Sequence, residues 1–472
     1  MMRKTKIICT LGPSSDRENV LENMFLNGMN CARFNFSHGT HPEHKVRIER
    51  LRSLCRAHNV NIPLLLDTKG PEIRLGIFEN GAETLSEGQK FTLTPKDIPG
   101  TAEISSVSYK ELAEHVKVGD VILIDDGKIS VSVEAVEGGD VICTVTTGGK
   151  VSNRKSLNIP GVAIPVPYLR DADKSDILFG IKEDFDFIAA SFVRSAEDVC
   201  RLRTFLKENG GESIQIISKI ENRQGLDNLD EIIEASDGIM VARGDLGVEI
   251  PFRYLPAIQK EIIEKCNAKG KYVVTATQML ESMTHSLRPT RAEVSDVANA
   301  IYDGTTAIML SGESASGDYP AETVKTMGEI AEAAEKSINY TELFGKAKVC
   351  YIRDFTHAIG HAACDLAYSL DAKALIVVTR SGRSARNIAA NKPNCPVIAV
   401  TLDPKGCRQL NFVWNVVSIP AAELKSGEDI FDYGVKKALE TGLIKKGDLV
   451  ALVAGSSQVK GEFSDMIKVD IA

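Results

Sequence analysis

Short apolar runs alternate with amphipathic, helix-like segments over two separated stretches of the chain. Eight of the runs have the length and composition of strands, at residues 5–13, 30–38, 63–71, 185–193, 214–222, 238–246, 272–280 and 307–314. Helix-like segments follow most of them, for example at residues 16–27, 226–235 and 291–302. Continuous apolar strands that alternate with helices are typical of a parallel sheet covered on both faces. Eight such units favour an α/β fold of the (β/α)8 TIM-barrel type over an open sheet.

The pattern changes between the third and fourth of these runs. Residues 128–136 and 141–147 alternate apolar and polar positions, and tight turns such as Asp126-Gly127 separate the short runs. This pattern predicts a small all-β domain, a β-barrel over residues 72–167, inserted into a barrel made of residues 1–71 and 168–340. Loops that follow barrel strands lie on the catalytic face, so we expect the insertion to act as a lid.

A third pattern begins at about residue 341. A helix-like segment at 357–370 precedes strand candidates at 374–379, 397–401, 416–419 and 449–454, and residues 466–471 are a candidate edge strand. This alternation predicts a doubly wound α/β domain over residues 341–472.

Composition narrows the classes of function. The 472 residues contain 56 basic and 64 acidic side chains, a formal charge of −8, which argues against binding nucleic acid through overall charge. No apolar run reaches the roughly 18 residues of a membrane helix. The ten cysteines are scattered without close pairs, which argues against zinc sites and disulfide scaffolds. We therefore expect a reduced, cytoplasmic protein.

Ionisable and polar side chains gather at the ends of the predicted barrel strands. In chain order they are Arg33, Asn35, Ser37, His38, Asp67, Thr68, Lys69, Arg74, Lys219, Glu221, Arg243, Asp245, Thr277, Gln278, Ser311 and Glu313. The carboxyl ends of barrel strands face one pocket, and the cost of desolvating so many charges there indicates a charged ligand.

The types of side chain narrow the chemistry. Glu221 and Asp245 are hard oxygen ligands that suit Mg²⁺ or Mn²⁺, while Arg33, Arg74 and Lys219 are suited to clamping phosphate. Taken singly, each has an ordinary explanation, such as a solvated lysine, a structural ion pair or a helix cap. Their convergence favours phosphoryl transfer or enolate chemistry.

Longer motifs resemble those of the pyruvate kinase family, in the same order over nearly the whole chain. They are MNCARFNFSHG (29–39), LLLDTKGPEIR (64–74), IISKIENRQGL (216–226), GIMVARGDLGVEIP (238–251), ATQMLESM (276–283), RPTRAEVSDVANAI (288–301) and MLSGESASGDYP (309–320). The start of the chain resembles the shorter bacterial form, without the N-terminal extension of animal enzymes. The resemblance implies transfer of the phosphoryl group of phosphoenolpyruvate to ADP, giving pyruvate and ATP in the last step of glycolysis.

The resemblance also implies roles for individual residues. Lys219 and Arg33 would neutralise the migrating phosphoryl group, and the enolate would be protonated through Thr277, Ser311 and water, with the donor left open. The other implied groups are a substrate-binding set (Arg33, Gly244, Asp245, Thr277), a divalent-metal pair (Glu221, Asp245), a K⁺ site (Asn35, Ser37, Asp67, Thr68) and nucleotide contacts (Asn35, His38, Arg74, Lys155). Glu72 matches the form of the family that depends on K⁺.

The C-terminal domain contains a second candidate site. Hydroxyls, a glycine and arginines lie between a predicted strand and helix, at Thr379, Arg380, Ser381, Gly382, Arg383 and Ser384, where they can cradle a phosphate. The segment resembles the loop by which the family binds sugar-phosphate activators. Residues 455–464 depart from the pattern associated with fructose 1,6-bisphosphate, so that ligand, a sugar monophosphate and AMP all stay open. The family resemblance also implies a homotetramer.

Two other classes of function are compatible with parts of the pattern. A Mg²⁺-dependent carbon–carbon lyase acting on pyruvate-like substrates would share Glu221 and Asp245 but would not need Arg74, Lys155 or the K⁺ site. A non-catalytic sensor would use residues 379–384 and would have lost a catalytic residue. The sequence retains them all.

Overall fold

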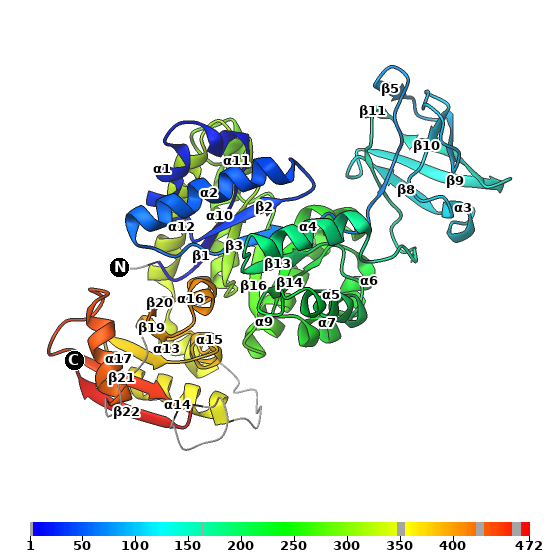
Figure 1. Cartoon of the computed structure of the whole chain (residues 1–472). Helices are drawn as coiled ribbons and strands as arrows, with labels where there is room; N and C mark the ends of the chain where they lie inside the picture. Colours follow the sequence, from blue (N-terminus) through cyan, green and yellow to red (C-terminus); the bar gives the residue numbers. More distant parts are fainter. Residues whose placement is uncertain (1–2, 163, 347–354, 422–428, 456–463) are drawn as a thin grey trace.

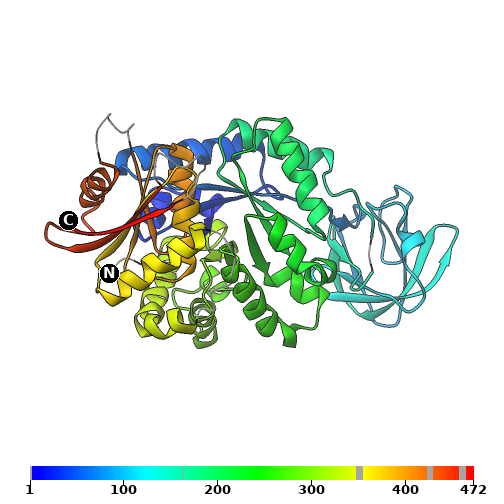
Figure 2. The same cartoon turned by 90° about the horizontal axis from the view of Figure 1, so that it is seen from below.

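Three bodies make up the chain in the computed structural model, which describes residues 3–162, 164–346, 355–421, 429–455 and 464–472 (Figures 1 and 2). The central body is a closed barrel of eight parallel strands in the order β1-β17-β16-β15-β14-β13-β3-β2. Their bounds are β1 Lys6–Thr10, β2 Cys31–Asn35, β3 Leu64–Asp67, β13 Phe187–Ala190, β14 Gln215–Ile220, β15 Gly238–Ala242, β16 Tyr272–Ala276 and β17 Ala307–Leu310. The predicted TIM barrel is confirmed, and each strand lies within one of the eight apolar runs.

Helices surround the barrel and cover the outer face of its sheet. They are α1 Val20–Leu26, α2 His41–His58, α4 Asp171–Lys182, α5 Ala196–Glu208, α6 Arg223–Asp227, α7 Leu229–Ala235, α8 Arg243–Glu249, α9 Leu255–Ala268, α10 Arg291–Tyr302, α11 Gly312–Ala315 and α12 Pro320–Ser337, with 3-10 turns η1 Pro13–Asp16, η2 Phe252–Tyr254 and η3 Glu281–Thr284. The next helix, α13 Tyr340–Lys346, packs with the C-terminal body, where the ring of Phe344 lies on those of His361 and Tyr368. Alternate residues of the barrel strands belong to two different apolar cores. Ile8, Leu65 and Ile217 belong to the core that includes the barrel interior, whereas Ile7 and Leu66 pack with the helices.

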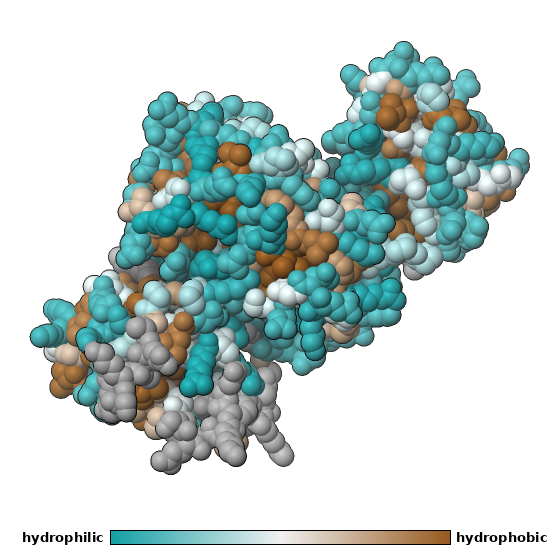
Figure 3. All heavy atoms as spheres, in the orientation of Figure 1, coloured by the Kyte–Doolittle hydropathy of each residue, from teal (hydrophilic) through white to brown (hydrophobic). Residues whose placement is uncertain are grey.

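The inserted body is all-β and stands away from the barrel (Figures 1 and 3). Its seven-stranded sheet has the order β4-β12-β8-β9-β10-β6-β7, and β11 pairs with β5. A bridge between Leu75 and Val107, next to β4 and β7, joins the two edges of the sheet and closes it into a small barrel. The elements are β4 Ile73–Arg74, β5 Ala82–Leu85, β6 Lys90–Thr94, β7 Ile104–Ser106, α3 Leu112–His115, β8 Val121–Ile124, β9 Ile129–Glu137, β10 Asp140–Thr147, β11 Gly149–Ser152 and β12 Ser156–Asn158.

The C-terminal body is a five-stranded sheet in the order β20-β19-β18-β21-β22, parallel except for the edge strand β22. Ala363 of α14 and Ile388 of α15 pack in one core with Leu375, while Tyr433 of α17 packs with Ile376 in another. Helices therefore cover both faces, as the doubly wound prediction requires. The bounds are α14 Phe355–Ser369, β18 Ala374–Val378, α15 Arg383–Ala390, β19 Val397–Thr401, α16 Pro404–Leu410, β20 Val416–Pro420, α17 Ile430–Leu439, β21 Leu449–Ala454 and β22 Met466–Ile471.

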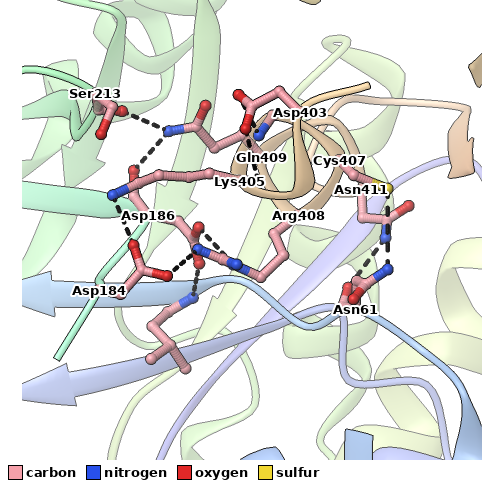
Figure 4. Close-up of polar contacts among 12 residues, drawn as sticks. Asn61, Asp184, Asp186, Ser213, Asp403, Lys405, Cys407, Arg408, Gln409 and Asn411 are labelled. Carbon is pink, nitrogen blue, oxygen red and sulfur yellow. Dashed lines mark hydrogen bonds and ion pairs between the residues drawn. The ribbon is translucent and has the colours of Figure 1, made fainter. Parts of the chain in front are cut away.

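This body docks on the floor of the barrel, the end where the strands begin. Arg408 of α16 forms ion pairs with Asp184 (2.7 Å) and with Asp186 (2.8 Å), which precedes β13 (Figure 4). The ring of Phe412 lies 5.0 Å from that of Phe187, so the apolar core of the interface continues into the barrel. The opposite end, the mouth, is left for ligands. Within the described ranges, no helix combines the length and apolar character of a membrane span.

Candidate active site

A buried network of charges occupies the mouth of the barrel. Asp67, at the end of β3, accepts a hydrogen bond from Arg33 of β2 (Nε to Oδ2, 2.7 Å) and another from Lys219 of β14 (Nζ to Oδ1, 3.1 Å). Lys219 Nζ also lies 2.7 Å from Glu221 Oε1. The sequence separates these residues by up to 188 positions, and the parallel barrel brings their side chains into one cluster.

Asp67 and Lys219 hold each other in their ionised forms. Burial alone would raise the pKa of Asp67, but Arg33 and Lys219 outweigh it and lower the pKa. Burial alone would lower the pKa of Lys219, but Asp67, Glu221 and Asp245 outweigh it and raise the pKa. Lys219 is therefore a fixed positive charge at neutral pH, as the neutralisation of a migrating anionic group requires.

Glu221 and Asp245 fit a divalent cation. Burial, reinforced by the Asp245 carboxylate, raises the pKa of Glu221 to about 8 in spite of Lys219. Lys219 Nζ approaches Glu221 Oε1 without hydrogen-bond geometry, so that buried oxygen has no aligned donor among the residues that the structure describes. A cation would supply the missing positive charge. Among the described residues no group of three or more His, Cys, Asp or Glu side chains could hold a metal ion, so water and substrate oxygens would complete the coordination shell.

Gly244 and Thr277 meet at the other side of the mouth. Gly244 N, in the first turn of α8, donates a hydrogen bond to Thr277 Oγ1 (2.8 Å), just beyond the end of β16. Ser311 follows β17, and its amide donates to Glu313 Oε2 (2.7 Å). In the described part of the chain Ser311 Oγ is a buried hydroxyl with no hydrogen-bond partner. A buried, unsatisfied hydroxyl at the mouth fits a role toward a ligand.

The four residues predicted for K⁺ come from the ends of two adjacent strands. Asn35 and Asp67 are register partners in the β2–β3 pair. Asn35 Oδ1 accepts the amide of Ser37 (3.0 Å), and Thr68 Oγ1 accepts the amide of Ser191 (3.1 Å). Their donor atoms are oxygens, as a hard cation requires, and Asn35 Oδ1 would have to share its lone pairs between Ser37 and the ion.

The residues predicted for the nucleotide are divided between two bodies. Arg74 lies on β4 and Lys155 immediately precedes β12, the neighbouring strand of the insertion; Lys155 Nζ pairs with Asp125 (2.8 Å). His38 is exposed on the barrel, in the loop between β2 and α2. Arg74 is held by Glu72 (2.6 Å), so a nucleotide would have to compete for this guanidinium. A ligand bound by all three would contact both the barrel and the insertion.

The loop predicted for an effector lies between β18 and α15. Gly382 N donates to Thr379 Oγ1 (3.1 Å), Gly382 has a φ of +75°, and Ser384 is buried against Ser464. Arg380, Ser381 and Arg383 are exposed. The sheet order reverses beside β18, and such a switch point is where open α/β sheets bind ligands. Of the divergent segment 455–464, residues 456–463 lie outside the described residues.

Ser191 and Thr10 belong to the network, although sequence reasoning did not select them. Ser191 Oγ donates to Thr68 O (2.7 Å) and accepts from Lys219 Nζ (2.9 Å), and Thr10 Oγ1 accepts from Arg33 Nη1 (2.7 Å). The signal was available, because Ser191 directly follows the fourth barrel strand and Thr10 ends the first.

Comparison with known proteins gives one family. A model described as pyruvate kinase, barrel domain, matches residues 2–324, and one described as pyruvate kinase, alpha/beta domain, matches residues 357–470. A pyruvate kinase of Clostridium acetobutylicum is 49% identical over the full length of both chains, and one of Geobacillus stearothermophilus is 46% identical over all of this chain and 81% of its own. A solved pyruvate kinase from Cryptosporidium parvum superposes with a TM-score of 0.93 at 39% identity, covering 99% of this chain and 96% of its own. The chain belongs to the pyruvate kinase family.

Proposed function

We propose that this chain transfers the phosphoryl group of phosphoenolpyruvate to ADP, giving pyruvate and ATP. The observation that carries the proposal is the cluster of Arg33, Asp67, Lys219 and Glu221, in which cations from two strands share buried carboxylates at the mouth. Phosphoryl transfer needs positioning and charge more than covalent help from the protein. Arg33 and Lys219 neutralise the migrating group from two directions.

The carboxylate of the substrate is bound by Gly244, Asp245 and Thr277. The contact between the Gly244 amide and Thr277 Oγ1 supports this grouping. The enolate is protonated through Thr277, Ser311 and water, and the unsatisfied hydroxyl of Ser311 supports its part. Arg33 contributes to substrate binding as well as to catalysis.

Two kinds of cation complete the site. Glu221 and Asp245 hold Mg²⁺ or Mn²⁺, which when bound supplies positive charge against the phosphoryl oxygens and the developing enolate. Asn35, Ser37, Asp67 and Thr68 hold K⁺, a role supported by the register that pairs Asn35 with Asp67. The chain itself fixes these ligands on rigid strand ends.

The nucleotide is bound by Asn35, His38, Arg74 and Lys155. Support comes from the division of these residues between the barrel and the insertion, which makes closure of the insertion a condition for full binding. A closed lid excludes water that would otherwise accept the phosphoryl group.

A phosphorylated metabolite binds at Thr379, Arg380, Ser381, Arg383 and Ser384 and activates the enzyme, which works as a homotetramer. The position of this loop at the switch point of the C-terminal sheet supports the site. Activation requires that the effector bind two arrangements of the subunits with different affinity.

A coupled assay of pyruvate formation tests the proposal. We expect activity that needs phosphoenolpyruvate, ADP, a divalent cation and K⁺ together, and that rises with one of fructose 1,6-bisphosphate, a sugar monophosphate or AMP. Pyruvate release without ADP would instead identify a lyase. Absence of any turnover, with effector binding retained, would identify a sensor.

A further inference from the structure

The turn that follows β16 carries Thr277 in an unusual backbone conformation. Thr277 has a φ of +69° and Gln278 a φ of +52°. A β-branched residue at positive φ is strained, and such strain persists only where the surroundings impose it. The contacts of this turn should therefore include the group that imposes it.

Arg243 hydrogen-bonds three consecutive carbonyls at the start of this turn. Its Nη2 donates to Thr277 O (2.6 Å) and Gln278 O (3.4 Å), and its Nε donates to Ala276 O (3.3 Å). The guanidinium is itself fixed by Asp296 of α10, which accepts from Nη1 at 2.8 Å. The planar fork of arginine makes these contacts simultaneously, which the single ammonium of lysine cannot do.

The same carbonyl links Arg243 to the hydroxyl of Thr277. Thr277 Oγ1 donates to Ala276 O (2.6 Å), so its proton must leave that carbonyl before it can reach a substrate. When the hydroxyl turns away, Arg243 Nε still hydrogen-bonds Ala276 O. A buried carbonyl left without a partner would otherwise oppose the rotation.

We propose that Arg243, oriented by Asp296, is a positioning residue that presents the hydroxyl of Thr277 to the substrate. The inference rests on the proposed role of Thr277 and goes beyond it by naming the groups that set its geometry. Arg243 acts through Thr277, not through contact with substrate.

The experiment compares Arg243→Lys, Asp296→Asn, Thr277→Val and the double variant Arg243→Lys/Thr277→Val. Arg203→Lys is the matched control, since Arg203 also joins a carbonyl (Ala235 O, 2.8 Å) to a carboxylate (Asp237, 3.1 Å), but at the opposite end of β15. The readouts are kcat, the KM values of both substrates, and deuterium exchange into the methyl group of pyruvate in the reverse reaction.

We expect Arg243→Lys to lower kcat and the exchange rate by about 10- to 100-fold, because small misplacements of a reacting group cost this much. Asp296→Asn, which leaves Arg243 in place, should lower both by roughly threefold to tenfold, with the KM for ADP unchanged. Arg203→Lys should stay within about twofold of the parent, as expected for a contact remote from the reacting groups. The double variant should be no slower than Thr277→Val, since both changes act on one hydroxyl.

Parental kcat and exchange in Arg243→Lys, or additive losses in the double variant, would overturn the positioning role while leaving the proposed function intact. A parent protein that forms no pyruvate from phosphoenolpyruvate would instead overturn the proposed function.

Discussion

Lysines are buried at both ends of the barrel, and they differ in charge. Lys219 at the mouth is 9% exposed, and Lys6 and Lys392 at the floor are 5% and 8% exposed. The carboxylates of Asp67 and Glu221 raise the pKa of Lys219 against burial. Burial lowers the pKa of Lys6 and of Lys392 to about 7. Neighbouring charges, rather than depth of burial, decide which lysine is a permanent cation.

The floor lysines bind carbonyls instead of carboxylates. Lys6 Nζ donates to Val416 O and Lys392 Nζ to Gly304 O, each at 2.9 Å, and both contacts cross the interface between barrel and C-terminal body. The charged side chains at the mouth instead form ion pairs and hydrogen bonds with one another. The buried hydroxyl Ser311 Oγ there has no hydrogen-bond partner among the described residues. A buried charge therefore occurs both at a domain interface and at a candidate site, and the partners of the charge distinguish the two: carboxylates at the mouth, backbone carbonyls at the floor.

The largest expected effect comes from removing the lysine of the mouth. Lys219→Met should lower kcat by a factor on the order of 10³ or more, the size found for cations that contact a migrating phosphoryl group. Metal binding should persist, because the carboxylates of Glu221 and Asp245 remain. Steady-state kinetics and metal titration measure the two effects.

Lys392→Met is the matched control for that variant. It removes a lysine of similar burial from the floor, so the folded protein should keep its kcat. Near-parental turnover in Lys219→Met, or equal losses in both variants, would remove the distinction between the two ends.

The ion pairs of the floor should matter for stability alone. Arg408→Met leaves the carboxylate of Asp186 buried and unpaired; burial already raises the pKa of Asp186 to about 6 despite Arg408. Removing one partner of a buried pair costs about 3–5 kcal/mol of unfolding free energy. Denaturant unfolding should show this loss, with kcat of the folded protein unchanged.

The exposed pair of Arg201 with Glu197 provides the comparison for Arg408. Arg201→Met should lower the unfolding free energy far less than Arg408→Met does, because an ion pair in solvent contributes little. A loss of kcat in Arg408→Met at temperatures where the variant is fully folded would mean that the contacts at the floor affect catalysis at the mouth.

The sequence was sufficient for the fold because its signals are local and repeated. Each barrel strand is a continuous apolar run, and the edge strand β22 falls on the predicted residues 466–471. The mouth was also predictable in outline, since parallel strands carry their carboxyl ends to one face.

The partners of each side chain were not predictable, because they depend on register and rotamer. The sequence marks Arg243 as a charged residue at a strand end, but only the structure shows that its guanidinium hydrogen-bonds the turn that contains Thr277. Arg408 gave no sequence signal of its ion pair with Asp186, which lies 222 positions earlier. The roles of the individual site residues stay predictions for the same reason.

The lowered pKa of Lys392 predicts a pH dependence at the floor. Between pH 7 and 10.5 the unfolded chain binds more protons at this residue than the folded protein does. Its contribution to stability should therefore rise with pH in that window and be lost as the pH falls toward 7, by roughly 1 kcal/mol per pH unit. Unfolding free energies of the parent and of Lys392→Met, compared at pH 7.5 and about 9, measure the difference.

Lys260 is the exposed control for that measurement. Lys260→Met removes an ammonium group from the surface, and its unfolding free energy is measured at the same two pH values. A difference between Lys392→Met and the parent that does not change with pH would mean that the floor lysine is charged like Lys219, and the contrast between the two ends would fail.

The smallest expected effect concerns the monovalent cation. Burial raises the pKa of Glu72 against Arg74, and the carboxylates of Asp245 and Asp126 add to the shift, so other negative charges lie near Glu72. Replacing K⁺ by tetramethylammonium at equal ionic strength should lower kcat about tenfold, or ~1.4 kcal/mol. Glu72→Lys should relieve the requirement, since it puts an ammonium group at the mouth, whereas Glu87→Lys, on the exposed surface of the insertion, should not. A parent that is equally active in both salts would mean that the protein's own cations neutralise the carboxylates of the mouth without K⁺.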